Sequence, residues 1–125
     1  MTLKTAYEEL GGDYADIIYR VGEDMLLRLI GIFVRDSNYT DICTALECQD
    51  FEKAFRAAHT LKGVALNMSL PNLAKKADLL TETLRSRQHN DEIQPAFLQL
   101  SQEYHDTYSV FSELLAASAA GGEKA

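Results

Sequence analysis

Apolar side chains recur every three or four residues along most of this 125-residue chain, and no segment shows the alternation of a half-buried strand. This spacing predicts amphipathic α-helices, because it places the apolar residues on one helix face. Capping residues, glycines and prolines divide the pattern into expected helices at residues 3–10, 14–19, 23–36, 39–48, 51–68, 71–86 and 91–117. We expect an all-α fold, an antiparallel four-helix bundle with short extra N-terminal helices, over residues 1–118, and a disordered tail at residues 119–125.

Two of these helices have apolar stripes that should lie in the core. The stripe of residues 23–36 consists of Met25, Leu26, Leu29, Ile30 and Phe33, and that of residues 91–117 consists of Phe97, Leu100, Tyr104, Tyr108, Phe111 and Leu115. Their helical spacing is typical of core packing, so we interpret the two tyrosines as core residues rather than as part of a cofactor site.

The composition argues against several classes of partner. The formal net charge is −7, whereas nucleic acids and anionic membranes require a basic surface on their binding proteins. No apolar run has the length of a membrane span, and the N-terminus lacks the features of a signal peptide. We expect a cytoplasmic monomer. Cys43 and Cys48, without a matching set of histidines, should be free thiols packed as small hydrophobic side chains.

The most informative short stretch is Ala58-His59-Thr60-Leu61-Lys62-Gly63, in the middle of the expected helix 51–68. At about 100° per residue, His59 shares one helix face with four residues about one turn away, namely Phe55, Arg56, Lys62 and Gly63. A titratable nucleophile, a cation and a missing side chain therefore lie on one patch of helix surface.

These residue types suit a histidine that is phosphorylated and recognised by a partner. A neutral imidazole is nucleophilic near physiological pH, and histidine side chains can form covalent intermediates. A phosphoryl group adds negative charge, which the flexible ammonium of Lys62 can balance. Gly63 costs roughly 1 kcal/mol relative to alanine inside a helix, so its presence needs a reason. Close approach of another protein to His59 is a plausible one.

A buried, hydrogen-bonded core histidine is the alternative interpretation of His59. The apolar arc of this helix is centred near Ala58 and Ala65, and its members are Phe51, Ala54, Phe55, Ala58, Leu61, Ala65 and Met68. His59 lies roughly a third of a turn from that centre, at the edge of the arc. The position, together with the neighbouring Lys62 and Gly63, favours the reactive interpretation.

With these residues, the chain resembles the histidine-containing phosphotransfer (HPt) domains of multistep bacterial phosphorelays. Their motif is His-x-x-Lys-Gly with a following asparagine and apolar residues on the next helix, here His59, Lys62, Gly63, Asn67, Leu73, Ala77 and Leu80. Residues 14–36 look like the first helices of the family, and residues 50–54 look like the start of its phosphorylated helix. The resemblance covers about residues 7–115. Val64, Ser69 and Thr81 depart from the residues that are frequent in the family.

The resemblance implies a role for each residue of the patch. His59 would accept a phosphoryl group from the aspartyl phosphate of one receiver domain and pass it to the aspartate of another, with Lys62 balancing its charge. The receiver domains of hybrid sensor kinases and response regulators would be the partners, and they would supply the Mg²⁺. The expected docking residues around His59 are Phe55, Arg56, Gly63, Leu66 and Asn67.

Other chemistry is weakly indicated. We interpret His89 as a solvated loop residue and His105 as a polar-face residue, and no residue set has the spacing of a metal site. The sequence has no Gly-rich phosphate loop or kinase signature, so we expect a phosphotransfer intermediate without kinase activity and without a cofactor of its own. The alternative of a different class is a non-phosphorylated helical adaptor or docking module with the same fold.

Overall fold

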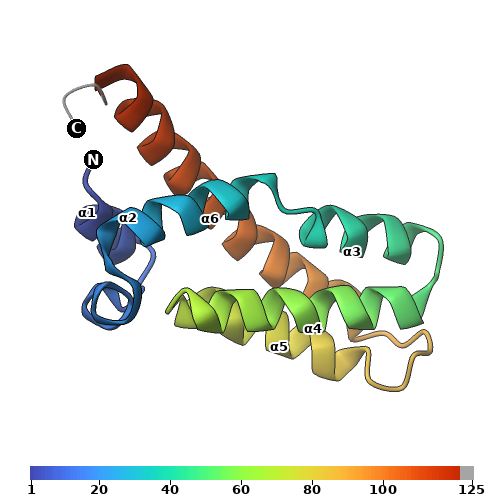
Figure 1. Ribbon diagram of the computed structural model, residues 1–125. Helices are drawn as coiled ribbons and strands as arrows, with labels where there is room; N and C mark the ends of the chain where they lie inside the picture. Colours follow the sequence, from blue (N-terminus) through green and yellow to red (C-terminus); the bar gives the residue numbers. More distant parts are fainter. Residues whose placement is uncertain (122–125) are drawn as a thin grey trace.

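Six α-helices make up the part of the chain that the computed structural model describes, residues 1–121 (Figure 1). They are α1 (Leu3–Glu9), α2 (Tyr14–Arg35), α3 (Asn38–Glu47), α4 (Phe51–Asn67), α5 (Pro71–Thr83) and α6 (Ile93–Gly121). No strand occurs within these residues, so the predicted all-α class is confirmed. No helix in the same range combines the length and the apolar character needed to cross a membrane.

Local sequence signals explain where the site-bearing helix and its neighbours begin. The carboxylates of Asp13 and Asp50 accept hydrogen bonds, both 3.1 Å long, from the backbone N–H groups of Asp16 and Lys53, and so cap α2 and α4. Pro71 lies in the first turn of α5, where its missing N–H leaves no intrahelical bond unmade. These boundaries agree with the predicted ones.

A kink at Gly22 divides α2 into two helical segments. Gly22 has φ 82° and ψ 169°, a conformation essentially reserved for glycine. The expected helices 14–19 and 23–36 are therefore both present, as two parts of one element.

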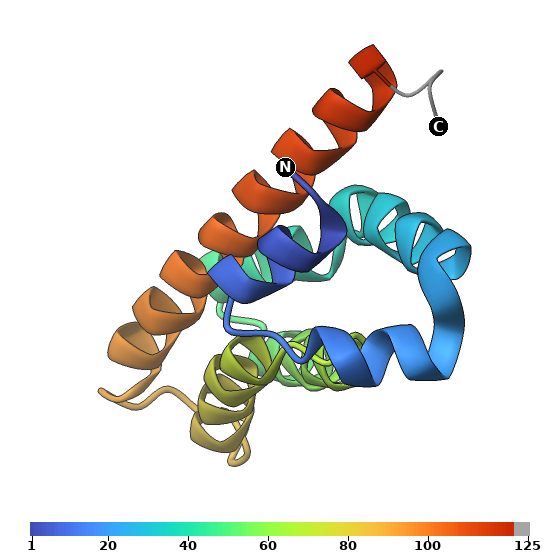
Figure 2. The same cartoon turned by 90° about the vertical axis from the view of Figure 1, so that its left-hand side faces the viewer.

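The bundle is arranged around α4. α4 packs against α3 and α5, and α5 packs against α6. The second half of α2 and α3 follow one another along the bundle and run antiparallel to α4 (Figure 1). α6 extends past this arrangement to α1 and α2, which pack against it (Figure 2). The predicted helical bundle with additional N-terminal helices is thus confirmed.

Aromatic packing attaches the N-terminal helices to α6. The buried ring of Phe111 lies 5.5 Å from that of Phe33 in an edge-to-face arrangement and 6.0 Å from that of Tyr7, measured between centroids. Aromatic pairs at such separations are stabilising beyond the area they bury. The N-terminal helices therefore belong to the same core as the bundle.

The predicted apolar stripes are wrong at two positions. Met25 and Tyr108 are 43% and 40% exposed. On α6 the buried face instead includes Thr107 and Leu114, because core contact follows the helix period whatever the polarity of the residue. The Thr107 hydroxyl donates to the carbonyl of Glu103 at 2.9 Å, which satisfies it within the core.

Two helix ends differ from expectation. α5 ends at Thr83 rather than near residue 86, because the chain turns there and Arg87 adopts a left-handed φ of 56°. α6 continues to Gly121, through alanines that favour helix, so residues 119–121 belong to it rather than to a tail. Residues 122–125, the rest of that predicted tail, lie outside the described residues.

The two cysteines are both free thiols, as predicted. Cys43 is half-buried, whereas Cys48 is exposed, so the expectation that both pack as small hydrophobic side chains is wrong for Cys48. Cys48 is the C-cap residue of α3, at the surface turn that leads into α4.

Candidate functional site

α4 presents His59 on its solvent face. Its opposite face is buried and consists of Ala54, Ala57, Ala58, Leu61 and Ala65. His59 itself is exposed, so the alternative of a core histidine is wrong. The small alanines let α3 and α5 pack closely on both sides of α4, which fixes the helix beneath the exposed imidazole.

Gly63 leaves open space beside His59. A Cβ added to Gly63 would meet no heavy atom within 4 Å beyond its chain neighbours and the helix's own backbone. Close packing inside the protein therefore does not explain this glycine.

Lys62 is held by a carboxylate from the neighbouring helix. Its Nζ lies 2.8 Å from Oδ1 of Asp78 on α5, and the two side chains are 31% and 44% exposed. The cation one turn from His59 thus already has an anionic partner in the unphosphorylated protein.

Phe55 lies between His59 and two arginines that follow α5. The rings of Phe55 and His59 are parallel within 2°, with centroids 6.2 Å apart. The guanidinium of Arg87 lies 3.7 Å from the Phe55 centroid and that of Arg85 lies 5.5 Å from it, so both can make cation–π contacts. Phe55 is consequently half-buried and covered, rather than a bare apolar side chain.

Carboxylates bind the other cations around His59. Glu52 accepts from Arg56 at 2.6 Å and from Arg87 at 3.0 Å. Arg85 donates to both carboxylate oxygens of Glu82, at 2.9 and 2.6 Å. Bidentate and shared contacts of this kind restrict the arginine side chains.

The charges on this side of His59 also affect one another's ionisation. Hydrogen bonding from Arg85 lowers the pKa of Glu82, and the charges of Arg85 and Lys62 contribute in the same direction, as does the His59 ring when it is protonated. Glu82 in turn raises the pKa of Arg85. Glu82 is therefore an ionised carboxylate near both His59 and Lys62.

On the other side of α4, toward α2, the surface is apolar. Ile32 on α2 is 55% exposed. A groove of about 180 Å³ separates the two helices, lined by Leu29, Ile32, Phe33, Asp36, Val64, Asn67 and Met68. Asn67, which was expected to dock a partner, thus lines this groove. Leu66, also expected to dock, is 56% exposed about two turns from His59 but lies outside the groove, in a separate hollow with Asp13, Asp16 and Pro71.

The C-terminal end of α4 is fixed by the N-terminal helices. Arg20 donates to the carbonyl of Asn67 at 2.8 Å and to the Ser69 hydroxyl at 2.7 Å, and that hydroxyl donates to Asp16 at 2.6 Å. Tyr7 donates to the carbonyl of Met68 at 2.8 Å. Ser69 has a left-handed φ of 57°, and these bonds offset the cost of that conformation in a residue other than glycine.

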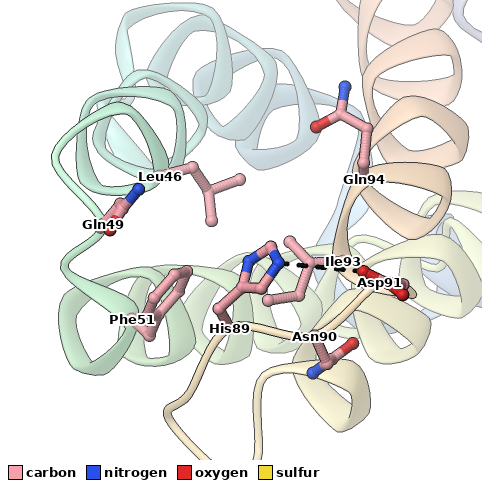
Figure 3. A pocket seen from close by; sticks show the side chains of 8 residues that line it. All are labelled: Leu46, Gln49, Phe51, His89, Asn90, Asp91, Ile93 and Gln94. Atoms are coloured by element: carbon pink, nitrogen blue, oxygen red, sulfur yellow. Dashed lines mark ion pairs between the residues drawn. The ribbon is translucent and has the colours of Figure 1, made fainter.

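The other two histidines lie in different surroundings. His89, in the loop before α6, lines a pocket of about 300 Å³ with Phe51 and Asn90, and its Nε2 lies 3.9 Å from Asp91 (Figure 3). His105 lies against the Tyr39 ring, at 5.3 Å between centroids. Within the described residues, no three histidine, cysteine or acidic side chains are grouped so that they could hold a metal ion.

Comparison with known families identifies the chain. The family model of the Hpt domain matches residues 32–120. The chain belongs to the Hpt domain family. No curated protein and no solved structure matches it. Hpt domains take part in phosphorelays as phosphotransfer intermediates and interact with receiver domains. The match includes all of α3, α4 and α5 and omits α1 and most of α2.

Within this Hpt domain, the sequence predictions do not include four charged residues that contact or influence the residues of the His59 patch: Asp78, Glu82, Arg85 and Arg87. The only sequence signal for the arginines is their pairing in the Arg-Ser-Arg stretch at residues 85–87, shortly before His89. Asp78 and Glu82 gave no separate signal, because acidic residues are common on exposed helix faces.

Proposed function

We propose that His59 is the phosphoacceptor of this Hpt domain and that the protein relays a phosphoryl group between two receiver domains. The observation that carries the proposal is the exposed imidazole on α4 beside the open space at Gly63. This arrangement gives an incoming aspartyl phosphate access to the imidazole along one face of the helix.

The chemistry follows from a neutral imidazole. The lone pair of the unprotonated ring nitrogen attacks phosphorus, an N–P bond forms, and the P–O bond to the receiver aspartate breaks with its electron pair on the carboxylate. The other ring nitrogen keeps its proton. The reverse sequence, with a second receiver, moves the group onward. The receiver would supply the Mg²⁺ and its own acidic pocket, while this chain would supply the nucleophile and the docking surface.

Two different flanks of His59 would meet the receiver. The flank toward α2 offers apolar contact through Ile32 and the groove beside Asn67, and the exposed Leu66 adds an apolar side chain about two turns along α4 from His59. The flank toward α5 offers cations. Arg87 lies over the Phe55 ring, and Arg56 shares the carboxylate of Glu52 with Arg87. An apolar flank and a cationic flank suit a partner whose reactive centre is acidic. We place this exchange in the cytoplasm.

The test is phosphoryl uptake from a phosphorylated receiver domain by wild type and by three matched variants, His59→Gln, His89→Gln and His105→Gln. We expect acid-labile, alkali-stable phosphate on wild type and on the last two variants, and none on His59→Gln. All four proteins should have similar melting curves, because each of these side chains is outside the core.

Uptake by His59→Gln would move the site to another residue. A wild type that binds receivers but takes no phosphate from any of them would favour the alternative of an adaptor module.

A further inference from the structure

The ion pair between Lys62 and Asp78 changes what the lysine can do for a phosphoryl group. Balancing the charge on His59 would require the ammonium to turn toward it, but Asp78 on α5 already binds it at 2.8 Å. A lysine has three donors on a flexible stem, so it can shift between two anions without unfolding its helix.

Asp78 differs from the other carboxylates around His59. Glu82 is bound by Arg85 through two hydrogen bonds, and Glu52 is bound by Arg56 and Arg87. These anions are engaged by guanidinium groups, whereas Asp78 is the carboxylate that holds Lys62. Removing the Asp78 carboxylate should therefore free the Lys62 ammonium and leave the ion pairs of Glu82 with Arg85 and of Glu52 with its arginines intact.

We propose that Asp78 is a positioning residue that competes with the phosphoryl group for Lys62 and thereby keeps phosphorylated His59 a good donor. This inference rests on the proposed function and names a further determinant of the same site. With Asp78 present, part of the stabilisation that Lys62 could give to phosphohistidine is spent on the ion pair. The phosphoryl group is then held less tightly and passes more readily to the next aspartate.

The size of the effect follows from the exposure of the pair. A partly exposed ion pair is worth little in water, and a competition of that strength corresponds to about a two- to five-fold change in an equilibrium constant. In Asp78→Asn, we expect the equilibrium between phosphorylated receiver and phosphorylated His59 to shift toward His59 by that factor. The half-life of the phosphohistidine should also lengthen, because the freed ammonium stabilises its ground state.

A double-mutant cycle tests whether Asp78 acts through Lys62. The proteins are wild type, Asp78→Asn, Lys62→Met and the double variant, with Glu8→Gln as matched control, since Glu8 pairs with Lys4 on the distant α1. Asp78→Asn should shift the equilibrium in the wild-type background and have no effect in the Lys62→Met background. Glu8→Gln should behave as wild type, and all melting curves should be similar.

Each other outcome decides against the proposal or against the function. If Asp78→Asn still shifts the equilibrium in the Lys62→Met background, the carboxylate acts on the phosphoryl group without the lysine. If Asp78→Asn shifts the equilibrium in neither background, Asp78 does not compete for Lys62. Either result overturns the proposal. Phosphoramidate, a small phosphoryl donor, separates the two claims. If receivers fail to phosphorylate His59 but phosphoramidate succeeds, the relay function fails, while the half-lives of the four phosphorylated proteins still decide the role of Asp78. If neither donor phosphorylates His59, both claims fail.

Discussion

Replacing Gly63 with alanine or glutamine should separate stability from phosphoryl transfer. In an exposed helix interior, Gly→Ala stabilises by roughly 0.5 to 1 kcal/mol, because the unfolded chain loses freedom and the helix gains propensity. No clash opposes this gain here, since the new Cβ would meet nothing within 4 Å beyond the local helix. For a domain of this size we expect Gly63→Ala to raise the melting temperature by roughly 2 to 5 °C.

Glutamine has nearly the same helix propensity as alanine, so Gly63→Gln should also fold and melt at or above the wild-type temperature. Its longer side chain would fill the open space one turn from His59. We therefore expect transfer from a receiver to fall by about ten-fold or more in Gly63→Gln, while Gly63→Ala changes it by less than about three-fold, because one methyl group obstructs far less than a glutamine side chain. Far-UV circular dichroism melts and quenched transfer reactions on the same preparations give both quantities.

Gly31 provides the matched control. It is also a glycine inside a helix, and a Cβ there would make only an ordinary contact, 3.6 Å from Nη1 of Arg35. Gly31→Ala and Gly31→Gln should therefore stabilise the protein without slowing transfer. If both Gly63 variants are destabilised, the glycine is needed for packing and the reasoning fails. If Gly63→Gln is folded and transfers at the wild-type rate, no partner approaches over this position.

Two further predictions concern the anchor of α4. Tyr7→Phe should destabilise the protein by about 1 to 3 kcal/mol in denaturant titration, because it leaves the carbonyl of Met68 without its buried 2.8 Å hydrogen bond; an unchanged midpoint would contradict this. Asp16 forms a hydrogen bond with Ser69 and an ion pair with Arg20, and both lower the pKa of its carboxyl below the ordinary value of 3.8. The ionised carboxylate therefore stabilises the folded protein fully above that pH. This contribution to the free energy of unfolding is lost as the pH falls through the lowered pKa of the folded state. Asp16→Asn should flatten this acid limb in urea titrations between about pH 5 and pH 2, and an unaltered limb would exclude Asp16 as its source.

The sequence predicted the helices well because their signals are local. Asp50 caps α4 and Pro71 begins α5, as expected from single residues at fixed offsets from the apolar pattern. The position of His59 at the solvent face also follows from periodicity alone, since the apolar arc fixes which residues face the core. Such properties depend on neighbours within one or two turns of the same helix.

The core positions that were wrong show the limit of ranking residues by hydrophobicity. Tyr108 was expected in the core and Thr107 was not, but the helix period puts Thr107 inside, where its hydroxyl can bond to the backbone one turn earlier. A threonine whose hydroxyl bonds to the backbone of its own helix can be buried without an unsatisfied polar group, even beside a tyrosine that stays exposed.

The electrostatics of the site depend on how α5 packs against α4, and no local pattern specifies that register. Lys62 is one turn from His59 on the same helix, so its nearness could be predicted. Asp78 is sixteen residues further along the chain, and it reaches Lys62 only because α5 lies beside α4 with that face turned toward it. The same packing brings Glu82 near the imidazole and lets Arg87 cover Phe55. The motif alone therefore suggests a histidine with a free cation beside it, whereas the folded site has a histidine whose cation is shared with a carboxylate. Under the proposed relay function, this difference would determine how tightly a phosphoryl group is held, and hence whether the domain favours accepting or donating it.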